Sequence, residues 1–188
     1  MNKTADQGTV ASSVPVLSRI TTVYIPTEDR VRLSGQVAPG RVVVVWLSLR
    51  LLNRMVPMLT EWLEKQDADL PRADLLQSVK QERARDQLLE RARQDGELPV
   101  PAEQPESDWL ARSVDVQQRS DRMQLIFKDQ PSPPQRLAAL PLQPLQLRQW
   151  LNILLTAYAQ AQWPLDVWPE WIREQVGVHK PRLASYLH

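Results

Sequence analysis

The chain contains no cysteine and only two histidines in 188 residues. The absence of cysteine excludes a disulfide framework, a thiolate nucleophile, a zinc finger and an iron–sulfur cluster. Two histidines are too few for a multi-histidine metal site. Glycine is scarce as well, with five residues, and most loops that cradle phosphate groups need several glycines close together. The composition therefore excludes several classes of enzyme and predicts no cofactor.

An excess of one sign of charge is also missing. The 23 Lys and Arg residues nearly balance the 22 Asp and Glu residues, so that the formal net charge is +1. This balance excludes a strongly basic protein of the histone type and a strongly acidic mimic of nucleic acid. Residues 1–65 and 111–188 are each net basic, whereas residues 66–110 are net acidic.

Long hydrophobic runs are absent too. The longest one covers residues 42–49, far short of the roughly 18–20 residues that span a bilayer. Residues 1–18 are mostly small and polar, without the apolar stretch of a signal peptide, and we expect them to form a flexible tail. We therefore expect a cytoplasmic protein that does not associate with membranes.

A first unit of three strands and a helix is predicted over residues 19–65. Arg30 to Ser34 alternate between polar and apolar residues, which predicts a strand that buries Val31 and Leu33 and turns Arg30 and Arg32 to solvent. The other elements of the unit are the strand 19–25, a turn at 35–40, a strand 41–46 buried on both faces, and a helix capped by Ser48.

Residues 66–110 have a different character. They predict a charged and largely solvated helix over about 72–94, followed by a proline-rich linker. Only a thin apolar stripe marks one side of this helix. Its members are Leu75, Leu76, Val79, Leu88 and Leu89.

The segment 111–163 repeats the pattern of the first unit. Asp121-Arg-Met-Gln-Leu125 matches Asp29-Arg-Val-Arg-Leu33, and a second apolar strand and amphipathic helix follow in the same order. We therefore predict an α+β fold of duplicated β-β-β-α units, each an antiparallel sheet with a packed helix.

The C-terminal segment 164–188 is rich in tryptophan. Trp168 and Trp171 lie three residues apart, so they share one face of a short helix that should begin at about residue 166 or 167. We expect this helix to dock on the core, because large aromatic residues gain most from burial. The alternative is a surface on which the tryptophans bind a partner.

The sequence contains no catalytic motif such as GxSxG or HExxH, and we predict no catalytic residues. The first functional hypothesis is a non-enzymatic interaction or assembly protein, with another protein or a second copy as its partner. It depends on the charged helix and on the tryptophan-rich segment.

The alternative hypothesis is a protein that binds single-stranded nucleic acid through sheet faces that carry arginine. The predicted order of elements is similar to that of the duplicated single-strand-binding folds of the Whirly type, in which antiparallel sheets contact nucleic acid. This resemblance implies a binding sheet but assigns no residues. The candidate binding residues for the two hypotheses are Arg30, Arg32, Arg122, Trp168 and Trp171.

Overall fold

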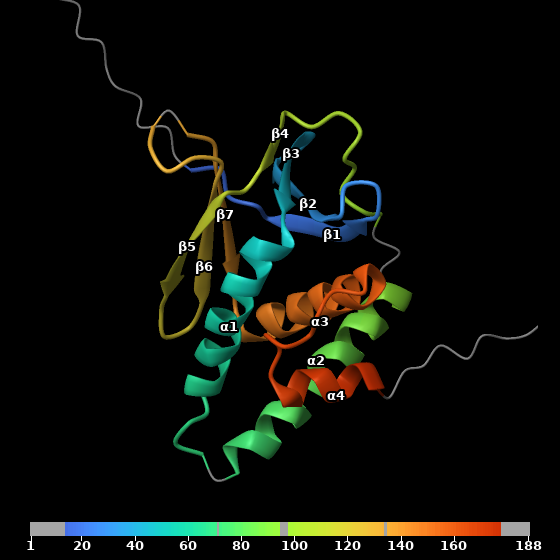
Figure 1. Cartoon of the computed structure of the whole chain (residues 1–188), viewed down its shortest axis with the longest axis vertical. Helices are drawn as coiled ribbons and strands as arrows, with labels where there is room; N and C mark the ends of the chain where they lie inside the picture. Colours follow the sequence, from blue (N-terminus) through green and yellow to red (C-terminus); the bar gives the residue numbers. More distant parts are fainter. Residues whose placement is uncertain (1–13, 71, 95–97, 134, 178–188) are drawn as a thin grey trace, which may run out of the picture.

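Two antiparallel β-meanders, each followed by a helix, organise the chain (Figure 1). The structure is a computed structural model that describes residues 14–70, 72–94, 98–133 and 135–177. In this part of the chain it is an α+β protein, as predicted, and it has two sheets and four helices. None of the helices described is both long and apolar enough to cross a membrane.

The elements are as follows. The first meander is β1 (Arg19–Ile25), β2 (Arg30–Ala38) and β3 (Arg41–Leu47), followed by α1 (Leu49–Lys65). The second is β5 (Ser113–Gln118), β6 (Met123–Lys128) and β7 (Leu137–Leu142), followed by α3 (Pro144–Ala161). Between them lie α2 (Ala73–Gln94) and β4 (Ser107–Leu110), and α4 (Glu170–Gly177) comes last.

The strands of the first meander confirm the alternation in the sequence. Val31 and Leu33 on β2 are fully buried, whereas Arg30 and Arg32 belong to the opposite face of the sheet. The four valines 42–45 of β3 are all buried, which confirms a strand covered on both faces. Ser48 caps α1 as predicted, because its Oγ accepts a hydrogen bond from the backbone N–H of Leu51.

The turn predicted at residues 35–40 is shorter than expected. β2 continues through Gly35 to Ala38, and only Pro39 and Gly40, whose φ is +72°, form the turn. Gly35 is required for packing and not for the turn, because a Cβ atom at this position would lie 2.6 Å from Cδ2 of Leu17. The glycine lets the Leu17 side chain lie directly on the sheet.

The prediction of a flexible tail is wrong for residues 14–18. Leu17 is buried, and its N–H donates a hydrogen bond of 2.8 Å to the carbonyl of Ala139 in β7. The N–H of Ser18 donates to the carbonyl of Gln36 in β2, at 2.9 Å. The segment therefore links the two sheets, while residues 1–13 lie outside the described residues.

A second link between the sheets comes from β4, which the sequence did not indicate. β4 pairs with β3 in parallel, and the following residues pass directly into β5. The N–H of Ala111 donates to Trp46 in β3, whereas the N–H of Arg112 donates to Lys128 in β6. With two such links, both meanders share one hydrophobic core.

The charged helix α2 packs on α3 and α4 mainly through a polar face, and not through its apolar stripe. Leu75 and Val79 are 55% and 54% exposed, whereas Gln77, Gln81 and Ala84 are buried. These three residues recur at helical spacing and face α3 and α4, against which α2 packs (Figure 1). A polar face can be buried here because the glutamine side chains find hydrogen-bond partners, as described below.

The tryptophan-rich segment docks on the core, as predicted for Trp168. This side chain is 2% exposed and packs edge-to-face on Tyr158 of α3, with ring centroids 5.2 Å apart. The helix itself starts later than predicted, at Glu170, because Pro169 disfavours helical geometry at the residue before it. Residues 178–188 lie outside the described residues.

Candidate nucleic-acid interface

The outer face of the four-stranded sheet is turned away from the helices (Figure 1). Its strands lie in the order β1-β2-β3-β4, and their register aligns one residue from each strand in a row across the sheet. The row consists of Val23, Arg32, Trp46 and Leu110. A guanidinium group and an indole thus belong to neighbouring strands at the same level of an outward face.

Part of this outer face is covered by the chain segment 98–106. The N–H of Val100 donates a hydrogen bond of 2.8 Å to Oγ1 of Thr21, and the Val100 side chain is buried. Glu106 forms a bidentate ion pair with Arg41 at the edge of the covered part. The remaining part of the face is partly exposed, with Val23 39% exposed and Arg32 and Trp46 half-buried.

Trp46 and Arg32 differ in how their polar atoms are used. The indole Nε1 of Trp46 donates a hydrogen bond of 2.5 Å to the carboxylate of Asp108 in β4, which fixes the ring on the face. Nε of Arg32 is buried without a hydrogen-bond partner among the described residues. Buried donors of this kind are rare, and a ligand that supplies an acceptor would satisfy it.

Three further arginines line a hollow of about 370 Å³ beside the row. Arg50 and Arg54 project from the first turns of α1, and Arg112 comes from the connection between β4 and β5. All three are exposed, and none forms an ion pair within the described part of the chain. Leu110 belongs both to the row and to the lining of the hollow, so the two are continuous.

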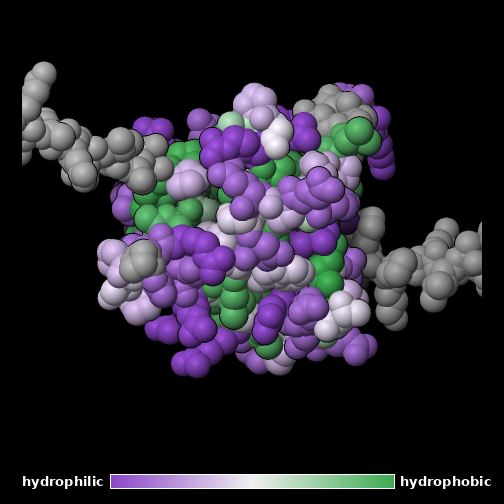
Figure 2. All heavy atoms as spheres, turned by 90° about the horizontal axis from the view of Figure 1, so that it is seen from above, coloured by the Kyte–Doolittle hydropathy of each residue, from purple (hydrophilic) through white to green (hydrophobic). Residues whose placement is uncertain are grey.

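We call this continuous region the arginine surface, and define it by Arg30, Arg32, Trp46, Arg50, Arg54 and Arg112. Arg30 belongs to it because Val31 pairs with Leu47, which places Arg30 beside the point where β3 enters α1. Figure 2 shows the molecule from above relative to Figure 1, and on that face hydrophilic side chains are interleaved with apolar ones. Such a mixture can contact both charged and aromatic groups of a ligand.

The structure brings only two of the five predicted site residues together. Arg30 and Arg32 share the outer face of β2, as the alternation indicated. Arg122 lies in the connection between β5 and β6 of the other sheet, 3.8 Å from Asp121. Trp168 is buried in the core, so it does not contribute to a surface in this structure.

The sequence reasoning missed Trp46 and the three arginines of the hollow. A two-residue turn at residues 39–40 would by itself pair Arg32 with Leu47 instead of Trp46. The β-bulge between Gln36 and Ala38 shifts the register by one residue and thereby places Trp46 opposite Arg32. No pattern in the sequence signals this bulge.

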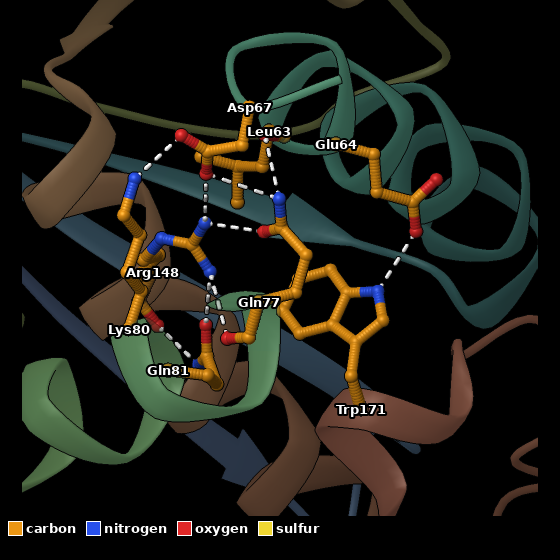
Figure 3. Close-up of polar contacts among 8 residues, drawn as sticks. All are labelled: Leu63, Glu64, Asp67, Gln77, Lys80, Gln81, Arg148 and Trp171. Carbon is orange, nitrogen blue, oxygen red and sulfur yellow. Dashed lines mark hydrogen bonds and ion pairs between the residues drawn. The ribbon is translucent and has the colours of Figure 1, made fainter. Parts of the chain in front are cut away.

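Trp171, the fifth predicted residue, belongs to a polar network between the helices (Figure 3). Its Nε1 donates to Glu64 of α1, and the guanidinium carbon of Arg148 lies 5.4 Å from the centroid of its ring. Arg148 is almost fully buried and donates hydrogen bonds to the side-chain oxygens of Gln77 and Gln81. These contacts explain the buried polar face of α2.

The charges of this network are unevenly compensated. The nearest carboxylate to Arg148 is that of Asp67, 3.8 Å away, and the same group accepts a hydrogen bond of 2.5 Å from Lys80. Burial lowers the pKa of Arg148 to about 10, and attraction to Asp67 only partly opposes this effect. Two cations therefore share one buried carboxylate.

No group of three or more His, Cys, Asp or Glu side chains that could hold a metal ion occurs among the residues that the structure describes. No family model, curated protein or solved structure matches the chain.

Proposed function

We propose that this protein is a non-enzymatic binding protein whose ligand is single-stranded nucleic acid, held on the arginine surface. The observation that carries the proposal is the row in which Arg32 and Trp46 lie side by side on an open sheet face. The arginine hollow extends this row toward α1.

The chemistry of the surface suits a single strand. Guanidinium groups bind phosphate oxygens through paired N–H donors, and five arginines without ion pairs in the described part of the chain can follow a phosphate backbone. An exposed part of the Trp46 ring can stack on a base, an interaction worth about 1–3 kcal/mol for each base. A broad sheet face accepts unpaired bases, whereas reading duplex DNA needs an element that enters a groove.

The experiment is a titration of a fluorescent single-stranded oligonucleotide, followed by anisotropy at several salt concentrations. The double variant Arg30→Gln/Arg32→Gln should lose at least about tenfold in affinity, because two phosphate contacts are removed. The matched control is Arg91→Gln/Arg93→Gln, which removes the same charge from exposed positions on α2. Equal losses of affinity in both double variants would show that only the net charge of the protein matters for binding, and this result would contradict the proposal.

A second candidate function is assembly, in which the chain pairs with another copy of itself. One observation favours it: Leu75 and Val79 lie one turn apart on α2 and are each more than half exposed. Burial of such residues is the usual driving force of association. Light scattering over a range of concentrations tests this function, and a Leu75→Glu/Val79→Glu variant should be monomeric wherever the unmodified protein is a dimer.

We also infer that the two β-β-β-α units arose by duplication. The support is the shared order of elements and the placement of Asp29-Arg30 and Asp121-Arg122 close to the start of the middle strand, with Arg30 as the first residue of β2 and Arg122 directly before β6. A superposition of residues 19–63 on 112–158 that aligns all three strands and the helix is the expected outcome. If the helices cross their sheets in different directions, the inference fails.

A further inference from the structure

A cavity of about 510 Å³ opens between the end of α1, α2 and the start of α3. The polar network of Figure 3 forms part of its wall, through Asp67, Lys80 and Arg148. Gln66, at the end of α1, and Arg83 and Gln87 of α2 complete the polar part of the lining. The apolar part of the lining consists of Leu63, Pro144 and Leu145.

The lining carries more positive than negative charge. Lys80, Arg83 and Arg148 contribute three cations, and Asp67 contributes the only carboxylate. Arg83 forms no ion pair with any residue that the structure describes. The Arg148 side chain is only 5% exposed, so water cannot screen its charge well. A buried charge of this kind is costly unless an opposite charge lies nearby.

The hydrogen bonds of Arg148 do not neutralise this excess of positive charge. The oxygens that Arg148 contacts belong to Gln77 and Gln81, which are neutral. The Asp67 carboxylate also accepts from Lys80 and Gln77, so its charge is shared. The ring of Trp171 adds a cation–π contact but no formal charge. An incoming anion would supply the missing negative charge.

A second feature of the lining narrows the class of anion. Oε1 of Gln87 is buried without a hydrogen-bond partner among the described residues. An acceptor in this position calls for a ligand that carries a hydroxyl donor as well as anionic oxygens. A phosphate monoester fits this lining, because its dianion supplies the negative charge at pH 7, and a hydroxyl group of its organic part or the P–OH of its monoanion would donate to Oε1 of Gln87. Its organic part would contact Leu63 and Leu145, of which Leu145 is 39% exposed.

We propose that this cavity binds a small organic phosphate monoester, with Lys80 and Arg83 in contact with the phosphate group. Arg148, buried in the cavity wall, would add positive charge. This site is separate from the arginine surface, and its ligand is a small molecule instead of a polymer. Binding there would tie α1, α2 and α3 together at their common junction.

The experiment is isothermal titration calorimetry of the full chain at low ionic strength, with inorganic phosphate and phenyl phosphate as probes. Phenyl phosphate should bind at least about tenfold more tightly than inorganic phosphate, because its ring reaches the apolar lining. Arg83→Gln should weaken both probes about tenfold or more, and it should leave the fold intact because Arg83 is exposed. The control Arg93→Gln, on the exposed end of the same helix, should bind as the unmodified protein does.

Three outcomes overturn the proposal. The first is no heat of binding from either probe up to about 10 mM, a concentration well above that of weak specific ligands. The second is equal affinity in Arg83→Gln and in the unmodified protein. The third is a loss of phosphate binding in Arg54→Gln but not in Arg83→Gln, which would place the anion on the arginine surface and leave the function proposed there standing.

Discussion

Arginine lies beside tryptophan in two regions of this molecule. The two pairs differ in whether the N–H groups of the guanidinium have hydrogen-bond acceptors within the protein. Between the helices, Arg148 is buried over Trp171, and neutral glutamine oxygens accept its hydrogen bonds. On the outer sheet face, Arg32 lies opposite Trp46, and its Nε has no partner among the described residues. The first pair holds helices together, whereas the second has donors left for a ligand.

The comparison shows that residue type alone does not separate structural from binding positions. The sequence offered Trp168 as a possible surface anchor and placed Trp46 in a buried strand, but Trp168 is 2% exposed and Trp46 is only half-buried on the outer sheet face. What separates them is whether another element covers the ring. Changes to the helical region should therefore affect stability, and changes to the sheet face should affect binding.

The largest expected effect is on Trp168. Trp168→Ala should lower the free energy of unfolding by about 3–5 kcal/mol, because it removes a buried ring that packs on Tyr158. Trp46→Ala should cost less, about 2 kcal/mol, because the half-buried ring loses only part of the packing of a core residue, together with one hydrogen bond to Asp108. Urea unfolding of both variants measures the difference. Equal losses in the two would remove the distinction between the regions.

A smaller but still large loss is expected for Arg148. Arg148→Met keeps much of the side-chain volume but leaves the glutamines and Asp67 without their cation, and it should cost about 3 kcal/mol. Lys80 still neutralises Asp67, which keeps the loss near the lower end of the usual range for a broken buried pair. The same urea titration measures it. A variant as stable as the unmodified protein would show that the network contributes no net stability.

Much of the fold was predictable from short-range patterns. The alternation around Val31 and Leu33, the valine run of β3 and the Ser48 cap each follow from local side-chain chemistry, and the structure confirms them. The buried face of α2 was not predictable in this way. Gln77 and Gln81 are buried because Arg148, distant in the sequence, supplies their hydrogen bonds, and a hydrophobicity pattern does not record that.

The candidate site was predictable only in part, for a related reason. Arg30 and Arg32 share a face because they are two residues apart on one strand. Trp46 joins them only through strand register, and Arg112 joins them only through the passage from β4 to β5. Both depend on pairings between distant segments, which a single sequence does not specify.

An effect of intermediate size is expected in the salt dependence of ligand binding to the arginine surface. For single-stranded ligands, the slope of the logarithm of affinity against the logarithm of salt concentration has a magnitude of about 0.7 for each phosphate contact. Arg50→Gln and Arg54→Gln should each reduce this slope by about that amount while leaving the urea midpoint almost unchanged. Unchanged slopes in both variants would exclude the hollow from the binding surface and restrict binding to the row on the sheet.

The smallest expected effect concerns pH. A hydrogen bond from the Arg136 guanidinium lowers the pKa of Asp129, and burial opposes this shift only in part. The ionised carboxylate is thus favoured in the folded protein, so its contribution to stability is present above about pH 4 and is lost as the pH falls through the lowered pKa. Asp129→Asn should therefore be less stable than the unmodified protein at pH 7, with a smaller difference at pH 3. A difference independent of pH would contradict this assignment.

The parallel pairing of β3 with β4 has a consequence for the chain as it is synthesised. β3 emerges from the ribosome before α1, α2 and the segment that covers the outer face, and its partner β4 follows all of them. At about 5–20 residues per second, the edge of β3 stays unpaired for several seconds. The backbone N–H of Leu17 stays without its acceptor for longer, because that acceptor, the carbonyl of Ala139, is synthesised near the end of the second meander. A nascent chain stopped before β4 would therefore expose a valine-rich strand edge, which is a template for aggregation, so that prompt translation of the second half protects the first.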